Sequence, residues 1–258
     1  MHFAFLGTSG AVPSLRRDST SLVFVGREES VLVDCGGSPV QRLLLAAVAP
    51  LSLGHVAITH IHPDHAYGLP SLIQNLILLG RAEPLRISCR DEHVEPLREV
   101  LRAFRMVDRK GMFPLSLEPV PARERVAVAT TASFRITASP NAHGSMANMA
   151  LRFDPLHGGP AVVYSSDTEP CESVAALARG ADTLVHEATF AERSRGRFGA
   201  HSTAGEAGDI AARAGVRRLI LTHIDSEHHD EVDLLAKEAQ ARFSGIVEIA
   251  EEFVPYPL

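Results

Sequence analysis

The sequence predicts an α/β fold in which β-sheets pack together and helices lie outside them. Short apolar runs rich in valine, isoleucine and phenylalanine recur along the chain, as expected for buried strands. Longer stretches with helical spacing of apolar residues lie between them. The first part of the chain is rich in strands, whereas the later strands alternate with helices. This order is typical of packed sheets covered by helices.

The expected elements follow one another in chain order. Strands are predicted at 2–6, 21–25, 30–33, 55–59, 85–88, 125–130, 133–138, 147–153, 161–164, 182–185, 218–222 and 245–249. Helices are predicted at 39–48, 69–79, 91–105, 172–179, 203–214 and 228–242. The proline-rich segment from Pro114 to Pro121 predicts a short, turn-rich crossing.

A single domain over residues 1–258 is the simplest prediction, because no linker rich in Pro, Gly or Ser and no low-complexity tract divides the chain. A weak internal echo connects the two halves. Each half has an apolar run that ends near an aspartate, Asp34 or Asp167, followed later by an Ile-Thr-His-Ile or Leu-Thr-His-Ile sequence. The echo fits either two similar halves that face each other or a chance repetition of short dipeptides.

The composition excludes several classes of protein. A hydrophobic fraction of 45% supplies a full core, and a net charge of -6 argues against a surface built to hold polyanions by bulk attraction. A specific anion pocket stays possible. Three scattered cysteines form neither a disulfide framework nor a Cys-x-x-Cys zinc site. The N-terminus does not resemble a signal peptide, so we expect a cytoplasmic protein without a membrane partner.

The densest group of the thirteen histidines directly follows a predicted strand. Four possible metal ligands fall within this group: His60, His62, Asp64 and His65. Alternation along an extended segment would project the imidazoles of His60 and His62, and Pro63 favours a turn into a helix. One metal would take the first two ligands and a second metal the last two. Zinc suits these donors, with manganese or iron as competitors. A solvated histidine-rich loop is the alternative.

Two metals need further ligands, and three residues occur in similar settings. His143, Asp167 and His223 each lie just past the end of a predicted strand, where loops on a rigid sheet carry functional groups. Each of them alone is more often an ordinary turn residue. Together with the first motif, they predict a dinuclear site built from several loops.

These residues resemble the signature of the metallo-β-lactamase superfamily and its ribonuclease Z-like hydrolases. The motif His-x-His-x-Asp-His is matched at 60–65, and a lone histidine, an aspartate and a last histidine follow in the same order. The resemblance implies three ligands for each metal and one bridging carboxylate: His60, His62 and His143; Asp64, His65 and His223; and Asp167. It also implies a four-layer αββα sandwich, with two mixed sheets between outer helices.

Further stretches resemble the ribonuclease Z-like branch. Residues 5–10 with 33–36 look like its opening strand, loop and Asp-Cys-Gly turn, and residues 186–190 with 201–203 look like its His-Glu-Ala-Thr and His-Ser-Thr pair. The resemblance implies that His201 protonates the leaving oxygen while Glu187 orients its imidazole. Without the family context, His201 fits a residue beside a helix start and Glu187 a buried structural carboxylate.

Additional candidates for substrate binding lie near His201. Ser202 and Thr203 precede a predicted helix, and residues 203–206 fit a capping box. Free backbone N–H groups at this helix start would receive a phosphate oxygen, although capping alone accounts for Thr203. Three arginines lie upstream as candidates for contacting an anionic substrate, with an exposed basic loop as the alternative: Arg193, Arg195 and Arg197.

The implied chemistry is hydrolysis. Two divalent cations about 3.5–4 Å apart lower the pKa of a shared water and clamp the oxygens of a displacement reaction. The nucleophile is then hydroxide, with Asp64 accepting a proton while it binds one metal. The sequence predicts a dinuclear phosphodiesterase for a small anionic ester: a cyclic nucleotide, a short oligonucleotide or another small diester.

Three departures from ribonuclease Z favour such a small substrate. Members that process tRNA usually carry a long arm between the lone histidine and the bridging aspartate, but His143 and Asp167 are too close in sequence for an arm. Residues 224–230 are acidic and lack a basic, aromatic continuation, and residues 37–39 read Gly-Ser-Pro instead of Glu-Gly-Thr. Binding of extended nucleic acid therefore stays open, with tRNA 3′ processing as the second alternative. The resemblance also allows a homodimer.

Other functions use the same residues. Hydrolysis of a lactone, thioester or aryl sulfate is the first alternative, because the superfamily reuses its metals widely. A redox di-iron protein often has an acidic residue where this chain has His62. A degenerate binding protein would have lost ligands, whereas all seven residues are present in this chain.

Overall fold

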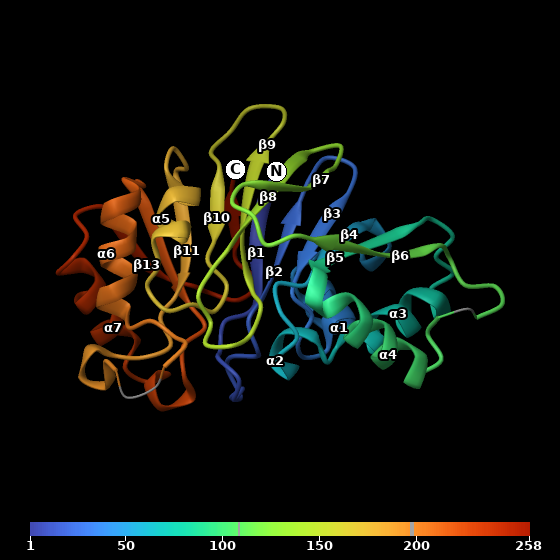
Figure 1. Cartoon of the computed structure of the whole chain (residues 1–258), viewed down its shortest axis with the longest axis horizontal. Helices are drawn as coiled ribbons and strands as arrows, with labels where there is room; N and C mark the ends of the chain where they lie inside the picture. Colours follow the sequence, from blue (N-terminus) through green and yellow to red (C-terminus); the bar gives the residue numbers. More distant parts are fainter. Residues whose placement is uncertain (108, 197–198) are drawn as a thin grey trace.

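Two seven-stranded β-sheets form the centre of the computed structural model, which describes residues 1–107, 109–196 and 199–258 (Figure 1). The first sheet has the order β14-β1-β2-β3-β4-β5-β6 and contains β1 (His2–Gly7), β2 (Ser21–Val25), β3 (Ser30–Val33), β4 (Leu53–Ala57), β5 (Leu85–Arg90), β6 (Leu115–Val120) and β14 (Pro255–Pro257). The second has the order β13-β12-β11-β10-β9-β8-β7 and contains β7 (Val126–Thr130), β8 (Phe134–Pro140), β9 (Met149–Pro155), β10 (Val162–Tyr164), β11 (Thr183–Glu187), β12 (Arg218–Thr222) and β13 (Ile246–Ile249).

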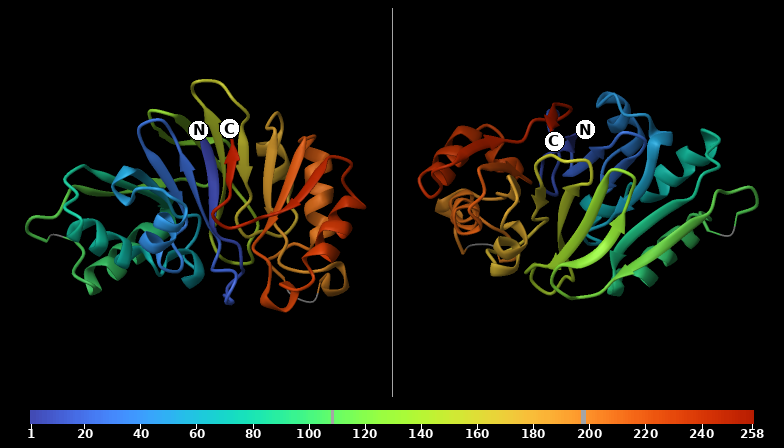
Figure 2. Two further views of the ribbon diagram at one scale, coloured as in Figure 1. Left: turned by 180° about the vertical axis from the view of Figure 1, so that it is seen from behind. Right: turned by 90° about the horizontal axis from the view of Figure 1, so that it is seen from above.

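Helices cover the outer face of each sheet, so the chain forms four layers (Figures 1 and 2). The first sheet is covered by α1 (Pro39–Leu45), α3 (Leu69–Leu78) and α4 (Val94–Ala103), and the second by α5 (Glu172–Ala178), α6 (Ala204–Ala214) and α7 (Val232–Gln240). The single-turn helix α2 (Pro63–Ala66) follows β4. The predicted αββα sandwich of two mixed sheets is confirmed. Every helix of the described residues is too short or too polar to cross a bilayer.

Each interface between layers has its own apolar cluster. Side chains such as Val56 of β4 pack against Leu72 of α3 outside the first sheet, and Leu219 of β12 packs in the corresponding cluster outside the second. Between the sheets, the rings of Phe24 and Phe153 stack with their centroids 3.6 Å apart. Because these two rings come from β2 and β9, their contact joins the two sheets.

The two sheets share one pattern of strand pairing. In each sheet, three antiparallel pairs lead into three parallel pairs, and β3 and β10 occupy the corresponding switch positions. Asp34 is the first residue after β3, and Asp167 is the third residue after β10. The topology therefore matches the internal echo that the sequence contains.

The prediction for Pro114 to Pro121 was wrong. Residues Leu115–Val120 form β6, which pairs in parallel with β5 through all six of its residues. Pro119 has no N–H group to donate, but β6 lies at the edge of its sheet and needs hydrogen-bonding partners on one side only. A proline is tolerated in a strand at this position, so the proline count misled the sequence prediction.

The side chain of His55 is buried and makes no hydrogen bond among the described residues. It lies in β4 beside Val31, which packs between the sheets, and both of its ring nitrogens are buried without a hydrogen-bond partner among the described residues. Burial lowers the pKa of His55 from 6.5 to about 4, and the charge of Arg86 contributes in the same direction. The unfolded chain therefore binds a proton at a higher pH than the folded chain does.

We expect this difference to make stability depend on pH. The contribution of neutral His55 is complete above pH 6.5 and is lost as the pH falls towards 4, so the free energy of unfolding drops by about 2 kcal/mol between pH 7.5 and 5. His55→Leu should remove this drop without loss of stability at pH 7.5. Urea unfolding followed by circular dichroism measures both values. Exposed His157→Leu is the control, and an unchanged drop in His55→Leu would contradict the assignment.

Candidate metal centre

The seven predicted ligands come from segments that follow four different strands. The first motif, at 60–65, follows β4, His143 follows β8, Asp167 follows β10, and His223 follows β12. The structure brings all seven together in two groups that share one residue. Within each group the donor atoms lie within 4.8 Å of one another: His60, His62, His143 and Asp167; and Asp64, His65, Asp167 and His223.

Asp167 lies between the two groups. Its Oδ2 atom is 3.7 Å from His60 Nε2 and 3.9 Å from His143 Nε2. The same oxygen is 3.4 Å from His65 Nε2 and 3.2 Å from His223 Nε2. One carboxylate therefore faces both groups, which is the position that a bridging ligand needs.

The donor atoms fit divalent cations. In the first group, Nδ1 of His62 lies 3.0 Å from Nε2 of His60 and 3.0 Å from Nε2 of His143, so three nitrogens converge on one point. In the second group, His65 Nε2, His223 Nε2 and Asp167 Oδ1 are buried and have no hydrogen-bond partner among the described residues. Buried polar atoms are rarely left unpaired, and imidazole with carboxylate is the donor set that zinc and related metals bind.

Hydrogen bonds outside the centre fix the orientation of the histidine rings. Three Nδ1 atoms donate to protein oxygens and so turn Nε2 towards the centre: His65 to Asp34 Oδ2 at 2.9 Å, His143 to the Ala200 carbonyl at 2.7 Å, and His223 to Thr189 Oγ1 at 2.9 Å. Such bonds determine the tautomer and raise the basicity of a ligand nitrogen. Thr189 and Asp34 were not assigned roles from the sequence, although both lie in stretches that resemble family motifs.

Asp34 is held rigidly for this task. The residue has φ of +59°, and its carboxylate accepts hydrogen bonds from the backbone N–H of Thr59 at 2.8 Å and from the Thr59 hydroxyl. Complete burial raises the pKa of Asp34, while the charge and hydrogen bond of His65 act in the opposite direction. Burying this carboxylate costs free energy, and its hydrogen bonds with Thr59 and His65 compensate for that cost.

Replacing Asp34 with alanine is expected to weaken metal binding by about 10- to 100-fold, since His65 loses the acceptor that orients it. Competition with a chelator measures the affinity. Asp34→Asn keeps an acceptor oxygen and should restore part of the loss, whereas Asp154→Ala, in β9, should bind metal like the unmodified protein. Equal metal affinity in Asp34→Ala and the unmodified protein would exclude a positioning role.

Four residues of the site have left-handed backbone conformations. Asp34, Ser166, Ala200 and His223 have φ values of +59°, +54°, +74° and +56°. Residues with side chains adopt this region rarely, at a cost of about 1–3 kcal/mol each, and such strain concentrates at functional sites. His223 and the carbonyl of Ala200 are thus presented to the centre by strained turns that the packed sheets stabilise.

His201 and Glu187 form a hydrogen-bonded pair beside the centre. His201 Nδ1 donates to Glu187 Oε1 at 2.9 Å, and the His201 side chain is 21% exposed whereas Glu187 is fully buried. Burial lowers the pKa of His201, but the charge and hydrogen bond of Glu187 outweigh it, so the pKa lies above its usual value. The ring centroid of His201 is 4.9 Å from that of His143 and 5.4 Å from that of His223. The imidazole therefore faces the metal centre, is accessible to solvent, and has a neighbour, Glu187, that favours its protonated form.

The hydroxyls of Ser202 and Thr203 already have protein partners. Ser202 Oγ donates to the Thr168 carbonyl at 2.6 Å, and Thr203 forms the predicted capping box with Glu206. The Thr203 hydroxyl also donates to Glu192, whose carboxylate lies against Gly205 so closely that a Cβ atom would clash there. An acidic group thus occupies the start of α6, where a phosphate was expected to bind. Substrate binding by Ser202 and Thr203 stays a prediction.

The candidate arginines are engaged in ion pairs. Arg193 pairs with Glu231, and Arg195 Nε lies 3.3 Å from carboxylate oxygens of both Glu192 and Glu206. Arg197 lies outside the described residues. The exposed-loop alternative therefore accounts for Arg193 and Arg195, because their charges are already balanced.

Comparison with known proteins places this geometry in a family. The family model of the β-lactamase superfamily domain matches residues 29–224. The chain belongs to this superfamily. The structure of a metallo-β-lactamase fold protein from Bacillus subtilis is similar to it, with a TM-score of 0.83 and 27% identity over 100% of this chain and 99% of that one. The short form of human tRNase Z, 21% identical, has the same fold, with a TM-score of 0.80 over 99% of this chain and 98% of that one.

Curated relatives share the sequence over nearly its whole length. Ribonuclease Z of Methanothermobacter thermautotrophicus is 31% identical over 98% of this chain and 95% of the relative. Ribonuclease Z of Methanosarcina mazei is 29% identical over 99% of both chains. The ribonuclease Z-like resemblance is confirmed, and the chain is a metal-dependent hydrolase whose fold family implies divalent metal ions.

Proposed function

We propose that this hydrolase uses two divalent metal ions, with zinc the expected metal, to cleave small phosphodiesters of nucleotide type. The observation that supports this proposal most directly is the position of Asp167 between two groups of donor atoms, with the imidazole of His201 beside them. A two-metal site and a proton donor together are what an in-line displacement at phosphorus requires.

The ligand assignment follows the two groups of donor atoms. One metal is assigned to His60, His62 and His143, the other to Asp64, His65 and His223, and Asp167 is assigned to both. When bound, the metals lower the pKa of a shared water and neutralise negative charge on the phosphoryl oxygens. We retain zinc as the expected ion because five of the seven donors are imidazole nitrogens.

The chain's own side chains then move the protons. Asp64, whose Oδ2 lies 3.4 Å from His65 Nε2, accepts a proton from the attacking water. His201 delivers a proton from Nε2 to the leaving oxygen, because its Nδ1 is held by Glu187. Glu187 also accepts hydrogen bonds from Thr168 N and Thr189 N and Oγ1, which keep the carboxylate in position. Glu187 is thus a positioning residue for His201.

The loops around the centre support a small substrate. The segment from His143 to Asp167 consists of a short loop, β9, the connection 156–161 and β10. It therefore has no room for an additional arm that would hold a large RNA. Alignments with ribonuclease Z span 302 and 303 residues, whereas this chain has 258, so the relatives contain segments that it lacks. Residues 224–230, which follow His223, carry three acidic side chains and repel an extended polyanion.

A second candidate is 3′ processing of tRNA precursors. It is supported by relatives named ribonuclease Z, one of which is 31% identical over 98% of this chain. The two candidates share the same metal centre and differ in whether the protein holds an RNA outside it. They are therefore separated by substrate size rather than by metal requirement.

The test compares substrates at matched metal concentration. The purified protein, loaded with zinc or manganese, is assayed with bis-p-nitrophenyl phosphate, cyclic nucleotides, dinucleotides, precursor tRNA and an aryl lactone. We expect turnover of the small diesters well above that of a His62→Ala background, and little cleavage of precursor tRNA. Efficient cleavage of precursor tRNA alone would select the second candidate. Lactone hydrolysis without diester turnover would overturn both and select the ester hydrolase alternative.

A further inference from the structure

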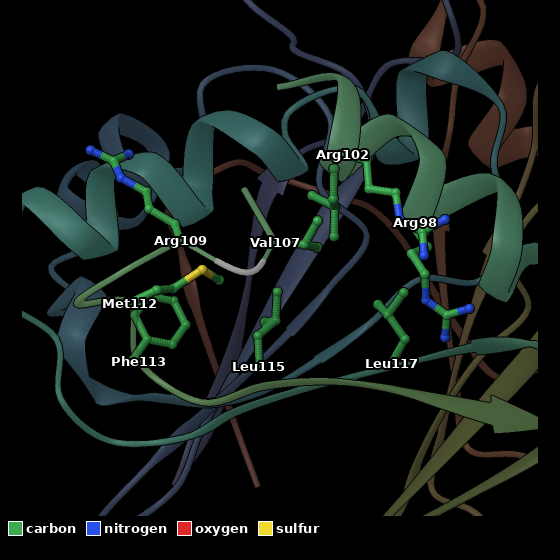
Figure 3. Close-up of a pocket in the computed structure, with 9 residues that line it drawn as sticks. Arg98, Arg102, Val107, Arg109, Met112, Phe113, Leu115 and Leu117 are labelled. Atoms are coloured by element: carbon green, nitrogen blue, oxygen red, sulfur yellow. The ribbon is translucent and has the colours of Figure 1, made fainter. Parts of the chain in front are cut away.

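A cavity of about 450 Å³ lies between α4 and the edge strand β6 (Figure 3). Its lining includes Leu115 and Leu117, which are two residues apart in β6 and so share one face of the strand, and Leu101 of α4. The cavity forms because β6 is an edge strand, so α4 has no further strand to pack against. None of the residues that line it belongs to the metal centre described above.

The polar groups at this cavity are cationic. Three arginines line it, namely Arg98, Arg102 and Arg109, and no described lining residue is acidic. Arg98 and Arg102 share the single carboxylate of Glu95, and Arg109 donates to the amide oxygen of Gln74 at 2.9 Å. Two guanidinium groups thus share one negative charge, and the third has a neutral partner. The cavity is net positive in a chain whose net charge is -6.

Two of the three arginines, Arg98 and Arg102, lie together at one end of the cavity, whereas Arg109 lies near Met112 at the other end (Figure 3). In Figure 3, Arg98 and Arg102 extend beside Leu117 at one end, whereas Met112, Phe113 and Leu115 lie towards the other. The two arginines use only their Nη1 atoms to bind Glu95 among the described residues, so further N–H groups are available. This arrangement matches a ligand with an anionic head and an apolar tail, and the volume falls in the range of about 300–1,000 Å³ typical of small-molecule sites.

We propose that this cavity binds a medium-chain carboxylate. The carboxylate head contacts Arg98 and Arg102, which already hold the carboxylate of Glu95 together, and the alkyl chain lies over Leu117 and Leu115 towards Met112. Guanidinium groups bind a planar carboxylate through paired N–H donors, which explains a preference for this head group. A nucleic acid would require a row of cations instead of one charged end and an apolar floor.

Calorimetric titration of the full-length protein with decanoate tests the site. We expect saturable binding at one site per chain, weakened at least about tenfold in Arg98→Gln/Arg102→Gln, because charge-assisted hydrogen bonds are lost. Glu95→Gln should act in the opposite direction and tighten binding severalfold, since it frees both guanidinium groups from a competing carboxylate. A structural role of these residues alone would not produce opposite effects.

The controls separate the two ends of the ligand. Arg217→Gln removes an exposed, ion-paired arginine elsewhere and should leave decanoate affinity unchanged. Decanol and inorganic phosphate each supply one half of the ligand and should bind much more weakly than decanoate. Thermal unfolding verifies that each variant is folded. Absence of saturable decanoate binding, or equal affinity in the unmodified protein and the double arginine variant, would overturn the proposal.

Discussion

Asp167→Ala is expected to abolish hydrolysis and to release bound metal. Its Oδ2 atom lies within 3.9 Å of four histidine nitrogens, two from each donor group. Removing it leaves those histidines without the negative charge that would balance the proposed pair of cations. Because a metal ion contributes several kcal/mol of transition-state stabilisation, we expect a loss on the order of 10³-fold or more in kcat/KM.

Metal content and activity must be measured on the same preparations. Elemental analysis should give clearly less metal per chain for Asp167→Ala than for the unmodified protein, and diester turnover should fall to the level of His62→Ala. The control is Asp233→Ala, which removes an exposed aspartate in α7 and should keep both the metal content and the diester turnover of the unmodified protein. If Asp167→Ala retained full metal content and activity, the assignment of a shared centre would be wrong.

Replacing His201 with alanine is expected to reveal its role through the leaving group. A nucleoside alkoxide needs a proton as it departs, whereas p-nitrophenolate does not. We therefore expect kcat to fall by about 10²- to 10⁴-fold for a dinucleotide and by far less for bis-p-nitrophenyl phosphate. Metal content should not change, because the Nδ1 atom of His201 is bonded to Glu187 and the residue is not in either four-residue donor group around Asp167.

Glu187→Gln tests the same pair from the other side. The amide keeps the size of the side chain but removes the charge that raises the pKa of His201, so the effect should have the same dependence on leaving group and a smaller magnitude. The exposed His157→Ala variant controls for loss of an imidazole. Equal losses for both classes of leaving group in His201→Ala would instead indicate a role in binding or folding.

Most of the fold was accessible from local patterns. The predicted runs at 21–25, 30–33 and 218–222 coincide with β2, β3 and β12, because buried strands have a simple apolar signature. Errors occurred where local signals and tertiary context conflict. The strand β6 was not predicted because its segment is rich in proline. The helix α7 begins at Val232 instead of 228 because a 3-10 turn at Ser226–His228, capped by Asp225, precedes it.

Some features of the site could be predicted from local sequence, and others could not. Chain order and residue type suggested the ligands, His201 and Glu187, since these residues sit in recognisable motifs after strands. The hydrogen bonds that His65 donates to Asp34 and His223 donates to Thr189 could not be predicted from local sequence. Each of them joins residues from different segments of the chain. Likewise, the ion pair of Arg193 with Glu231 connects segments that are distant in sequence.

The sequence by itself determined most of the strands, the kinds of donor atoms and the order in which these donors follow one another. The tertiary structure alone decided that Asp167 faces both histidine groups, that acidic side chains occupy the start of α6 and balance Arg193 and Arg195, and that a cationic cavity forms beside β6. The physical reason is that apolar periodicity is a local property of the chain. Distances between side chains on different strands depend instead on strand register and on how the two sheets pack.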